Sequence, residues 1–333
     1  MRSTPSRTLA SFAACALALV VGLAGCGSSG DGGGGGKDAS KVRASLIGRQ
    51  VPFFADLGSG LAAQAKGDRL DFSTVYAQFN PQDQLSSVEN LIAQQPGGLL
   101  VAPLDKRSLA PVLRSAQSDG IKVVTVADSL DDPSASSAYV GADFAEIGTR
   151  KAQAIVAALK GKGEVAFLNG PRGTSFVEEQ RAAAQKVFDA APGIKVVADD
   201  FAPLINKDAG LRATENVLTA HPNVAALFYS GDDAALGGVQ ALQERKIPLD
   251  KVFVAGTDGL AAGVAGVHAG QIDFTVSQCP YEVGRIAVRT LQQLLGGEKV
   301  PSVVTTPMID LTPATIDKTL SSNEWAACAG SKR

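Results

Sequence analysis

The chain has 333 residues, which suits one large α/β unit or two lobes and exceeds a single minimal domain. Hydrophobic residues make up 45% of the sequence and charged residues 19%, a balance that excludes disorder over most of the chain. The net charge of −2 argues against nucleic acid as the main partner, because nucleic-acid-binding proteins carry a basic stripe.

Residues 1–25 have the features of a secretory signal peptide. Arg2 and Arg7 precede an apolar run over residues 9–23 that is shorter than the roughly 20 residues of a membrane span, which is the alternative interpretation. The sequence Leu-Ala-Gly-Cys that ends at Cys26 resembles the bacterial lipobox, which implies a lipid on Cys26. Residues 26–41 are rich in Gly and Ser, so we expect a flexible tether between the membrane and the folded body.

Cysteine use also fits an exported protein. Of the four cysteines, one leaves with the signal and Cys26 takes lipid, which leaves Cys279 and Cys328 in an oxidising location. We expect a disulfide between these two that holds the C-terminal tail, with two buried free thiols as the alternative. His221 and His268 stand alone, so we expect neither a metal nor a cofactor.

From Val42 onward, short apolar runs alternate with amphipathic stretches of helical length. This order, with strands apolar on both faces, predicts parallel sheets covered by helices. Ten strands favour two doubly wound lobes of ordinary domain size over one sheet. The expected strands are Val42–Ile47, Thr74–Phe79, Gly98–Ala102, Lys122–Val126, Ala138–Val140, Glu164–Leu168, Ile194–Ala198, Ala225–Tyr229, Val252–Ala255 and Phe274–Ser277, and the longest helix between them is Asp143–Leu159.

Polar and aromatic side chains follow several of these strands. Ligands bind beyond the carboxyl ends of strands in open α/β sheets, so these residues are the candidate site. Each acid alone is as well explained as a helix N-cap, and the adjacent aromatics alone as a hydrophobic staple, but their joint occurrence favours a ligand site. The candidates are Gln50, Phe53, Phe54, Asp128, Arg181, Asp232, Asp258 and Gln278, with Arg181 expected beside Asp258.

This set of residues suits a sugar or polyol. Carboxylates accept hydrogen bonds from hydroxyl groups, Arg donates in a fixed fork, and aromatic rings cover the apolar face of a sugar. Each buried hydroxyl left without a partner costs about 1–3 kcal/mol, so such a site needs several polar groups and at least one ring.

The chain resembles the ribose-binding type of periplasmic solute-binding protein, the sugar-binding component of ABC importers that shares its fold with LacI-type repressors. The resemblance covers roughly residues 42–313. It is carried by the stretch Leu-Thr-Ala-His-Pro-Asn-Val that begins at Leu218, by Pro-Phe-Phe at Pro52, by Gly-Thr-Asp-Gly at Gly256, and by Leu-Gly-Gly-Glu-Lys-Val-Pro at Leu295.

The resemblance implies two lobes joined by a three-segment hinge, the fold of a type I periplasmic binding protein. The lobes would comprise residues 42–142 plus 279–306, and 143–278 plus 307–333. The family's sugar contacts map onto Phe53, Phe54, Asp128, Arg181, Asp258 and Gln278. The sequence departs from the family pattern at Val51, Ser129, Ile205 and Gly231, so the resemblance implies a sugar or polyol and not ribose specifically.

The expected function is therefore binding without catalysis: a monomer, lipid-anchored outside the cell membrane, captures a small sugar or polyol and delivers it to an ABC permease. A sensory binding protein is the first alternative. A secreted carbohydrate-acting hydrolase is less favoured, because the sequence has no Gly-x-Ser-x-Gly elbow and no paired acids in a catalytic context. A repressor needs a helix-turn-helix segment where this chain has a signal and a glycine run.

Overall fold

The computed structural model describes residues 37–330. The predicted signal peptide, Cys26 and most of the predicted tether lie outside the described residues. Within them, no helix is both long and apolar enough to cross a membrane.

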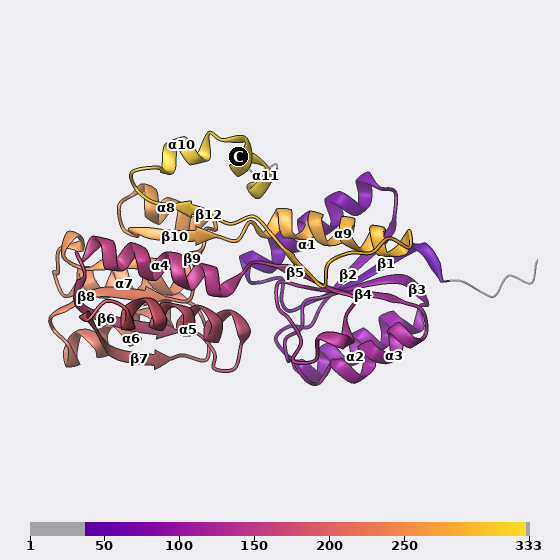
Figure 1. The fold of residues 1–333 in the computed structure, drawn as a ribbon, viewed down its shortest axis with the longest axis horizontal. Coiled ribbons are helices and arrows are strands. Elements are labelled where there is room, and N and C mark those ends of the chain that lie inside the picture. Colours follow the sequence, from indigo (N-terminus) through magenta and orange to yellow (C-terminus); the bar gives the residue numbers. More distant parts are fainter. Residues whose placement is uncertain (1–36, 331–333) are drawn as a thin grey trace, which may run out of the picture. The chain divides into compact units, whose positions relative to one another are not determined.

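Twelve strands of residues 37–330 form two six-stranded sheets covered by helices, which confirms the predicted α/β class with two doubly wound lobes (Figure 1). The first sheet has the order β11-β5-β4-β3-β1-β2, and all its strand pairs are parallel. The second has the order β12-β10-β9-β8-β6-β7, and β12 pairs antiparallel with β10.

The first lobe contains the first sheet and four helices. Its strands are β1 (Asp38–Leu46), β2 (Asp71–Tyr76), β3 (Pro96–Val101), β4 (Lys122–Val126), β5 (Ala138–Gly141) and β11 (Val303–Thr305). Its helices are α1 (Pro52–Gly67), α2 (Pro81–Ala93), α3 (Ala110–Ser118) and α9 (Pro280–Leu295), with a 3₁₀ turn at Pro133–Ala135.

The second lobe contains the second sheet and the C-terminal helices. Its strands are β6 (Lys162–Asn169), β7 (Gly193–Phe201), β8 (Val224–Tyr229), β9 (Phe253–Asp258), β10 (Phe274–Ser277) and β12 (Ile309–Leu311). Its helices are α4 (Phe144–Ala158), α5 (Ser175–Asp189), α6 (Lys207–Ala220), α7 (Asp232–Glu244), α8 (Ala261–His268), α10 (Ile316–Leu320) and α11 (Asn323–Ala329), with a 3₁₀ turn at Leu249–Lys251.

The chain passes from one sheet to the other after β5, after β10 and after β11. The predicted tether is too long at its end, because β1 begins at Asp38 and Asp38 already pairs with Pro96 of β3. The short strands β11 and β12 were not predicted, since each has only three residues. The second strand lies earlier than predicted, because Gln78 and Phe79 have positive φ angles and end it at Tyr76.

Close helix packing holds each lobe together. Helices α1 and α9, far apart in sequence, lie side by side in Figure 1. A Cβ atom on Gly60 would stand 1.9 Å from the carbonyl oxygen of Tyr281, so the two backbones meet where only glycine fits. Strands such as β3 are buried on both faces, as expected for parallel sheets between helices.

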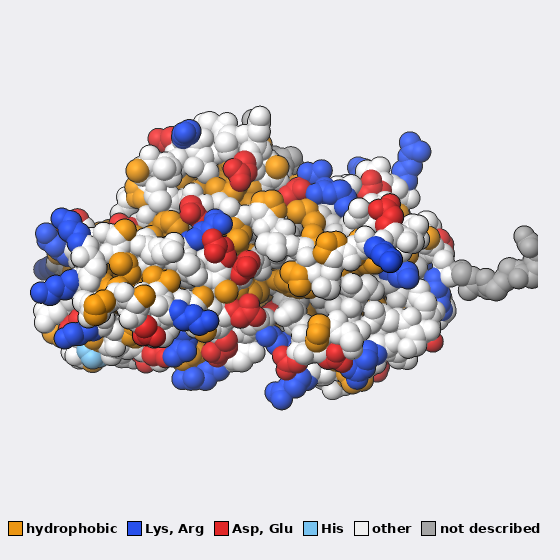
Figure 2. All heavy atoms as spheres, viewed as in Figure 1, with side chains coloured by type: hydrophobic (Ala, Val, Ile, Leu, Met, Phe, Trp, Pro, Cys, Tyr) orange, Lys and Arg blue, Asp and Glu red, His pale blue; other side chains and the backbone are white. Residues whose placement is uncertain are grey.

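Acidic and basic side chains are interspersed over the face shown in Figure 2, in keeping with the small net charge.

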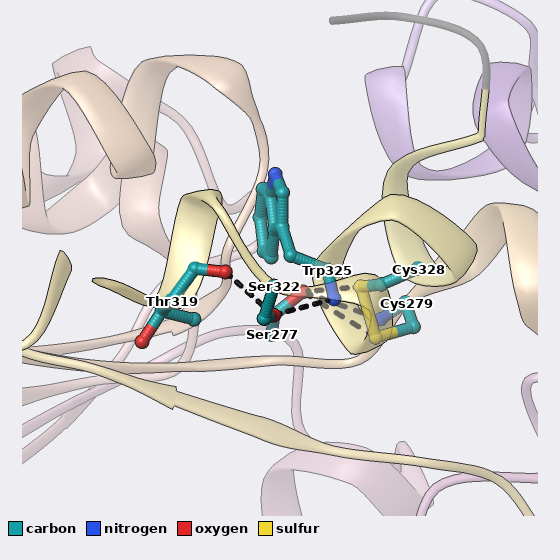
Figure 3. Close-up of a disulfide and its surroundings, with 6 residues drawn as sticks. All are labelled: Ser277, Cys279, Thr319, Ser322, Trp325 and Cys328. Atoms are coloured by element: carbon teal, nitrogen blue, oxygen red, sulfur yellow. Dashed lines mark hydrogen bonds between the residues drawn. A yellow bond between two sulfur atoms is a disulfide. The ribbon is translucent and has the colours of Figure 1, made fainter. Parts of the chain in front are cut away.

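The structure joins Cys279 and Cys328 in a disulfide with Cα atoms 4.5 Å apart (Figure 3). Cys279 is the N-cap residue of α9, and Cys328 lies in α11 near the C-terminus. The hydroxyl of Ser322 accepts a hydrogen bond from the Trp325 N–H at 3.0 Å and so caps α11. Trp325 packs on the same apolar cluster as both cysteines, so this cluster holds the tail against the second lobe.

Candidate functional site

The candidate site lies where strands of the two sheets end. Two residues there, Ala127 after β4 and Asp258 at the end of β9, have φ angles of 62° and 109° although neither is glycine. Such conformations are costly and persist only where the surrounding structure holds them, which is common at functional sites. Both mark a sharp change of chain direction at a predicted carboxylate: Ala127 directly precedes Asp128, and Asp258 is itself one of the candidates.

Asp258 and Gln278 form the best-defined part of the site. The Gln278 side chain, 5% exposed, donates from Nε2 to Asp258 Oδ1 at 2.8 Å. Among residues 37–330, Oδ2 of Asp258 has no hydrogen-bond partner, so this oxygen is available to a ligand. Burial raises the pKa of Asp258 well above its ordinary value, the charge of Asp232 adds to the rise, and the Gln278 hydrogen bond opposes it.

Asp232 holds the loop that follows β9, next to Asp258. Its side chain is 2% exposed, and its two oxygens accept hydrogen bonds from Thr275 Oγ1 at 2.6 Å and from the Gly259 N–H at 2.8 Å. A Cβ atom on Gly263 would stand 1.9 Å from Asp232 Oδ2, so the carboxylate is tightly enclosed. The predicted ligand contact by Asp232 therefore does not fit its position, because both oxygens are already used inside the lobe.

The predicted pairing of Arg181 with Asp258 is wrong. Arg181 lies on α5 and donates from Nε to both carboxylate oxygens of Asp199 on β7, at 2.8 and 2.9 Å. The Asp199 hydrogen bond raises the pKa of Arg181 above its ordinary value. The cation near Asp258 is instead Lys151 of α4, which is 0% exposed and which interacts electrostatically with both Asp258 and Asp232.

Asp128 forms a direct link between the lobes. The Ser175 hydroxyl, at the start of α5 in the second lobe, donates to Asp128 Oδ1 of the first lobe. Burial raises the pKa of Asp128, and the Ser175 hydroxyl opposes the rise. Beside this contact lies a cleft of about 210 Å³. Its lining residues come from both lobes and are Leu104, Asp105, Lys106, Arg107, Asp128, Asp131, Arg172, Gly173 and Thr174.

The aromatic pair lies in the first turn of α1, which begins at Pro52. The rings of Phe53 and Phe54 are 5.3 Å apart and nearly perpendicular, at 80°. The two rings therefore cannot both lie flat against the same face of a sugar. Phe54 packs against the apolar core of the first lobe, which leaves Phe53 as the candidate ring contact. Gln50 is exposed in the loop before α1.

Sequence reasoning missed Lys151 as a member of this group. A signal for Lys151 was present: it stands four residues from both Ile147 and Ile155 and so interrupts the apolar stripe of a helix. Such a position indicates either a buried charge with partners or an error in the helix assignment. The partners come from other elements, so the sequence alone does not reveal them.

Two doubly wound parallel-sheet lobes, linked by three crossings and bearing carboxylates at their strand ends, define a two-lobed solute-binding protein. Residues 45–299 match the family model of the periplasmic binding protein domain. The chain belongs to this family.

Relatives and solved structures place the chain among sugar-binding members. A periplasmic ribose ABC transporter protein from Conexibacter woesei is 43% identical, with a TM-score of 0.83 over 90% of this chain and 100% of that one. The ribose import binding protein of Escherichia coli is 32% identical, over 75% of this chain and 82% of that protein. A periplasmic solute-binding protein from Actinobacillus succinogenes, solved with bound D-allose, is 26% identical, with a TM-score of 0.79 over 84% and 99% of the two chains.

Proposed function

We propose that this protein captures a small sugar or polyol between its two lobes and delivers it to the permease of an ABC importer. The family and the relatives support a substrate-binding protein and not an enzyme. The observation that carries the ligand site is the arrangement at Asp258, where Gln278 donates to Oδ1 and no other residue of the described chain, 37–330, donates to Oδ2. A fixed carboxylate with an open oxygen is the acceptor that a sugar hydroxyl needs.

The proposed ligand contacts come from both lobes. The first lobe supplies Phe53 and Asp128, with Gln50 at the rim, and the second supplies Asp258 and Gln278. Arg181 and Asp232 are left out, because their polar atoms are bound to Asp199 and to the loop after β9. Phe54 is left in the core of the first lobe.

Ligand binding and lobe closure are coupled in this proposal. Contacts that involve both lobes exist only when the lobes are closed, so a ligand that makes them shifts the population toward the closed form. The three crossings between the sheets form the hinge. The Asp128–Ser175 hydrogen bond is one contact that opening must break. The closed outer surface would then be what the permease recognises.

The relatives support a class of ligand, small sugars and polyols. The relatives' names and bound ligands include a pentose, ribose, and a hexose, D-allose. These two sugars support a monosaccharide-sized solute.

A thermal-shift screen of the purified mature protein tests the proposed ligand class. We expect a rise in Tm with at least one of D-ribose, D-allose, xylitol or myo-inositol, because a ligand that binds only the folded state stabilises it. L-glutamine serves as the comparison from another solute class. A rise with L-glutamine and none with any of the polyols would contradict the proposal.

We also propose that the mature protein is a monomer held at the outer face of the cell membrane by lipid on Cys26. The lipobox-like sequence and the Gly-rich segment after it support this location. Cys26→Ser should move the protein from the membrane fraction to the soluble fraction. Retention of the variant in the membrane fraction would mean that residues 1–25 act as an ordinary anchor.

A further inference from the structure

A lysine is buried in the second lobe, behind the candidate site. Lys151 lies on α4, and its Nζ donates to the Tyr229 carbonyl oxygen at 2.5 Å, to Thr257 Oγ1 at 2.7 Å and to Gln180 Oε1 at 3.2 Å. Gly148, one turn earlier, lets α4 approach α5 closely, since a Cβ atom there would stand 2.1 Å from the Gln180 carbonyl oxygen. The close approach brings Lys151 within reach of the Gln180 side chain.

The contacts of Lys151 fit its charged form. An ammonium group has three N–H donors, and three acceptors surround Nζ, whereas a neutral amine would have one donor fewer and a lone pair. Nζ also lies 3.7 Å from the centre of the Phe228 ring, a position that favours a cation. A buried ammonium without a counter-charge is costly, so the site must supply negative charge.

Two carboxylates supply that charge. Lys151 Nζ contacts Thr257, the residue before Asp258, and Asp232 Oδ2 accepts from the N–H of Gly259, the residue after Asp258, so the three charged groups gather around one loop. Asp232 and Asp258 act electrostatically on Lys151, and Asp233 acts on both of them. The other elements packed around Lys151 contribute uncharged groups, namely Gln180 from α5, the Tyr229 carbonyl from β8 and Thr257 from β9. Thr275 of β10 reaches the group through Asp232.

We propose that Lys151 is a positioning residue for ligand binding, whose buried ammonium offsets Asp232 and so favours the ionised form of Asp258, which accepts a ligand hydroxyl. This inference rests on the proposed function, because it assigns the ligand contact to Asp258. Two carboxylates close together in a buried site cannot both ionise easily, and one then retains a proton. The positive charge of Lys151 removes this conflict without touching the ligand.

The mutual charges of Lys151 and the two carboxylates oppose the pKa shifts that burial causes. Burial raises the pKa of Asp232 to about 7 and that of Asp258 well above its ordinary value, and the charge of Lys151 opposes both rises. Burial lowers the pKa of Lys151 to about 7, and the two carboxylates oppose that change. Loss of the lysine should therefore push the pKa of Asp258 further upward.

Titration of the aspartate side chains by carbon-13 NMR in the ligand-free mature protein tests this electrostatic role directly. Asp258→Asn identifies the Asp258 signal. Lys151→Met should raise the titration midpoint of Asp258 by about one pH unit or more, as expected for loss of a nearby opposite charge. Lys160→Met, at an exposed lysine just beyond the same helix, should leave the midpoint unchanged. An unchanged Asp258 midpoint in Lys151→Met would overturn the proposal.

A second variant separates charge balance from folding. Asp232→Asn combined with Lys151→Met should return the midpoint of Asp258 toward its value in the wild type, because the competing carboxylate is gone. Asp232→Asn alone should lower the midpoint, which keeps the test decisive if Lys151→Met does not fold. A midpoint that stays as high in the double variant as in Lys151→Met, or that does not fall in Asp232→Asn, would show that Asp232 does not compete with Asp258 for ionisation and would overturn the proposal.

Affinity for D-ribose and D-allose at pH 6 and pH 8 then connects the charge to binding. Lys151→Met should weaken binding at least about tenfold more at pH 6 than at pH 8, whereas Lys151→Arg, which keeps the charge, should show a smaller difference. Equal weakening at both pH values would overturn the positioning role. Suppose the titration shows the Lys151–Asp258 interaction while Asp258→Asn binds these sugars as tightly as the wild type. That result would refute Asp258 as the ligand contact and leave the electrostatic interaction standing.

Discussion

Replacing Asp258 with asparagine removes one negative charge from the candidate site and leaves its shape almost unchanged. Asparagine tolerates positive φ angles, so it suits the backbone at 109° better than alanine would. Its side-chain oxygen can still accept the hydrogen bond from Gln278. The variant therefore tests the charge at Oδ2 and not the turn.

The expected loss follows from the oxygens that are free. Because Gln278 occupies Oδ1, we assign one strong ligand hydrogen bond to Oδ2 of Asp258. A charge-assisted hydrogen bond contributes about 1.5–3 kcal/mol, and each 1.4 kcal/mol is about tenfold in affinity. Asp258→Asn should therefore weaken binding of the sugar found in the thermal-shift screen by roughly 10- to 100-fold.

Isothermal titration calorimetry measures the affinity, and thermal unfolding of the ligand-free variant measures stability. Asp273→Asn is the matched control: Asp273 is also partly buried, but its carboxylate accepts from the Val254 N–H near the start of β9, away from the strand end. It should leave the affinity unchanged. If Asp258→Asn lowers the Tm of the ligand-free protein and leaves the affinity intact, Asp258 only stabilises the turn and the proposed contact is wrong.

Three further predictions concern the tail, the rings and pH. Thiol alkylation of non-reduced mature protein should modify neither Cys279 nor Cys328, and replacing both by Ala should cost about 4 kcal/mol of unfolding free energy in the chain-entropy model for a loop of 49 residues; two alkylated thiols would refute the disulfide. Phe53→Ala should weaken sugar binding without much loss of Tm, whereas Phe54→Ala should lower Tm by removing a partly buried core ring; the opposite pattern would exchange their roles. Burial lowers the pKa of Lys151 to about 7, so unfolding takes up a proton above that pH. The free energy of unfolding, measured in urea, should therefore rise from pH 7 to pH 9. A rise of equal size in Lys151→Met would show that Lys151 does not cause it.

The sequence was sufficient for the overall architecture. Apolar strand runs alternating with helical stretches predict covered parallel sheets, and the structure has two of them. The hydrophobic periodicity is a local property of the chain, so it can be recognised in the sequence without knowing any tertiary contact. The positions of Asp128, Asp258 and Gln278 at strand ends follow from the same pattern, because parallel strands deliver their carboxyl ends to one edge.

What only the tertiary structure decided is which side chains meet. The sequence analysis predicts Arg181 beside Asp258, but the neighbouring strand β7 carries Asp199 and the arginine pairs with it. Lys151 is distant in sequence from Asp258, and glycine-mediated contact between α4 and α5 buries it in the same lobe. The sequence determines which side chains stand at each strand end. The packing of helices and strands determines which of their charges lie close together, because the strength of an electrostatic interaction depends on distance and burial.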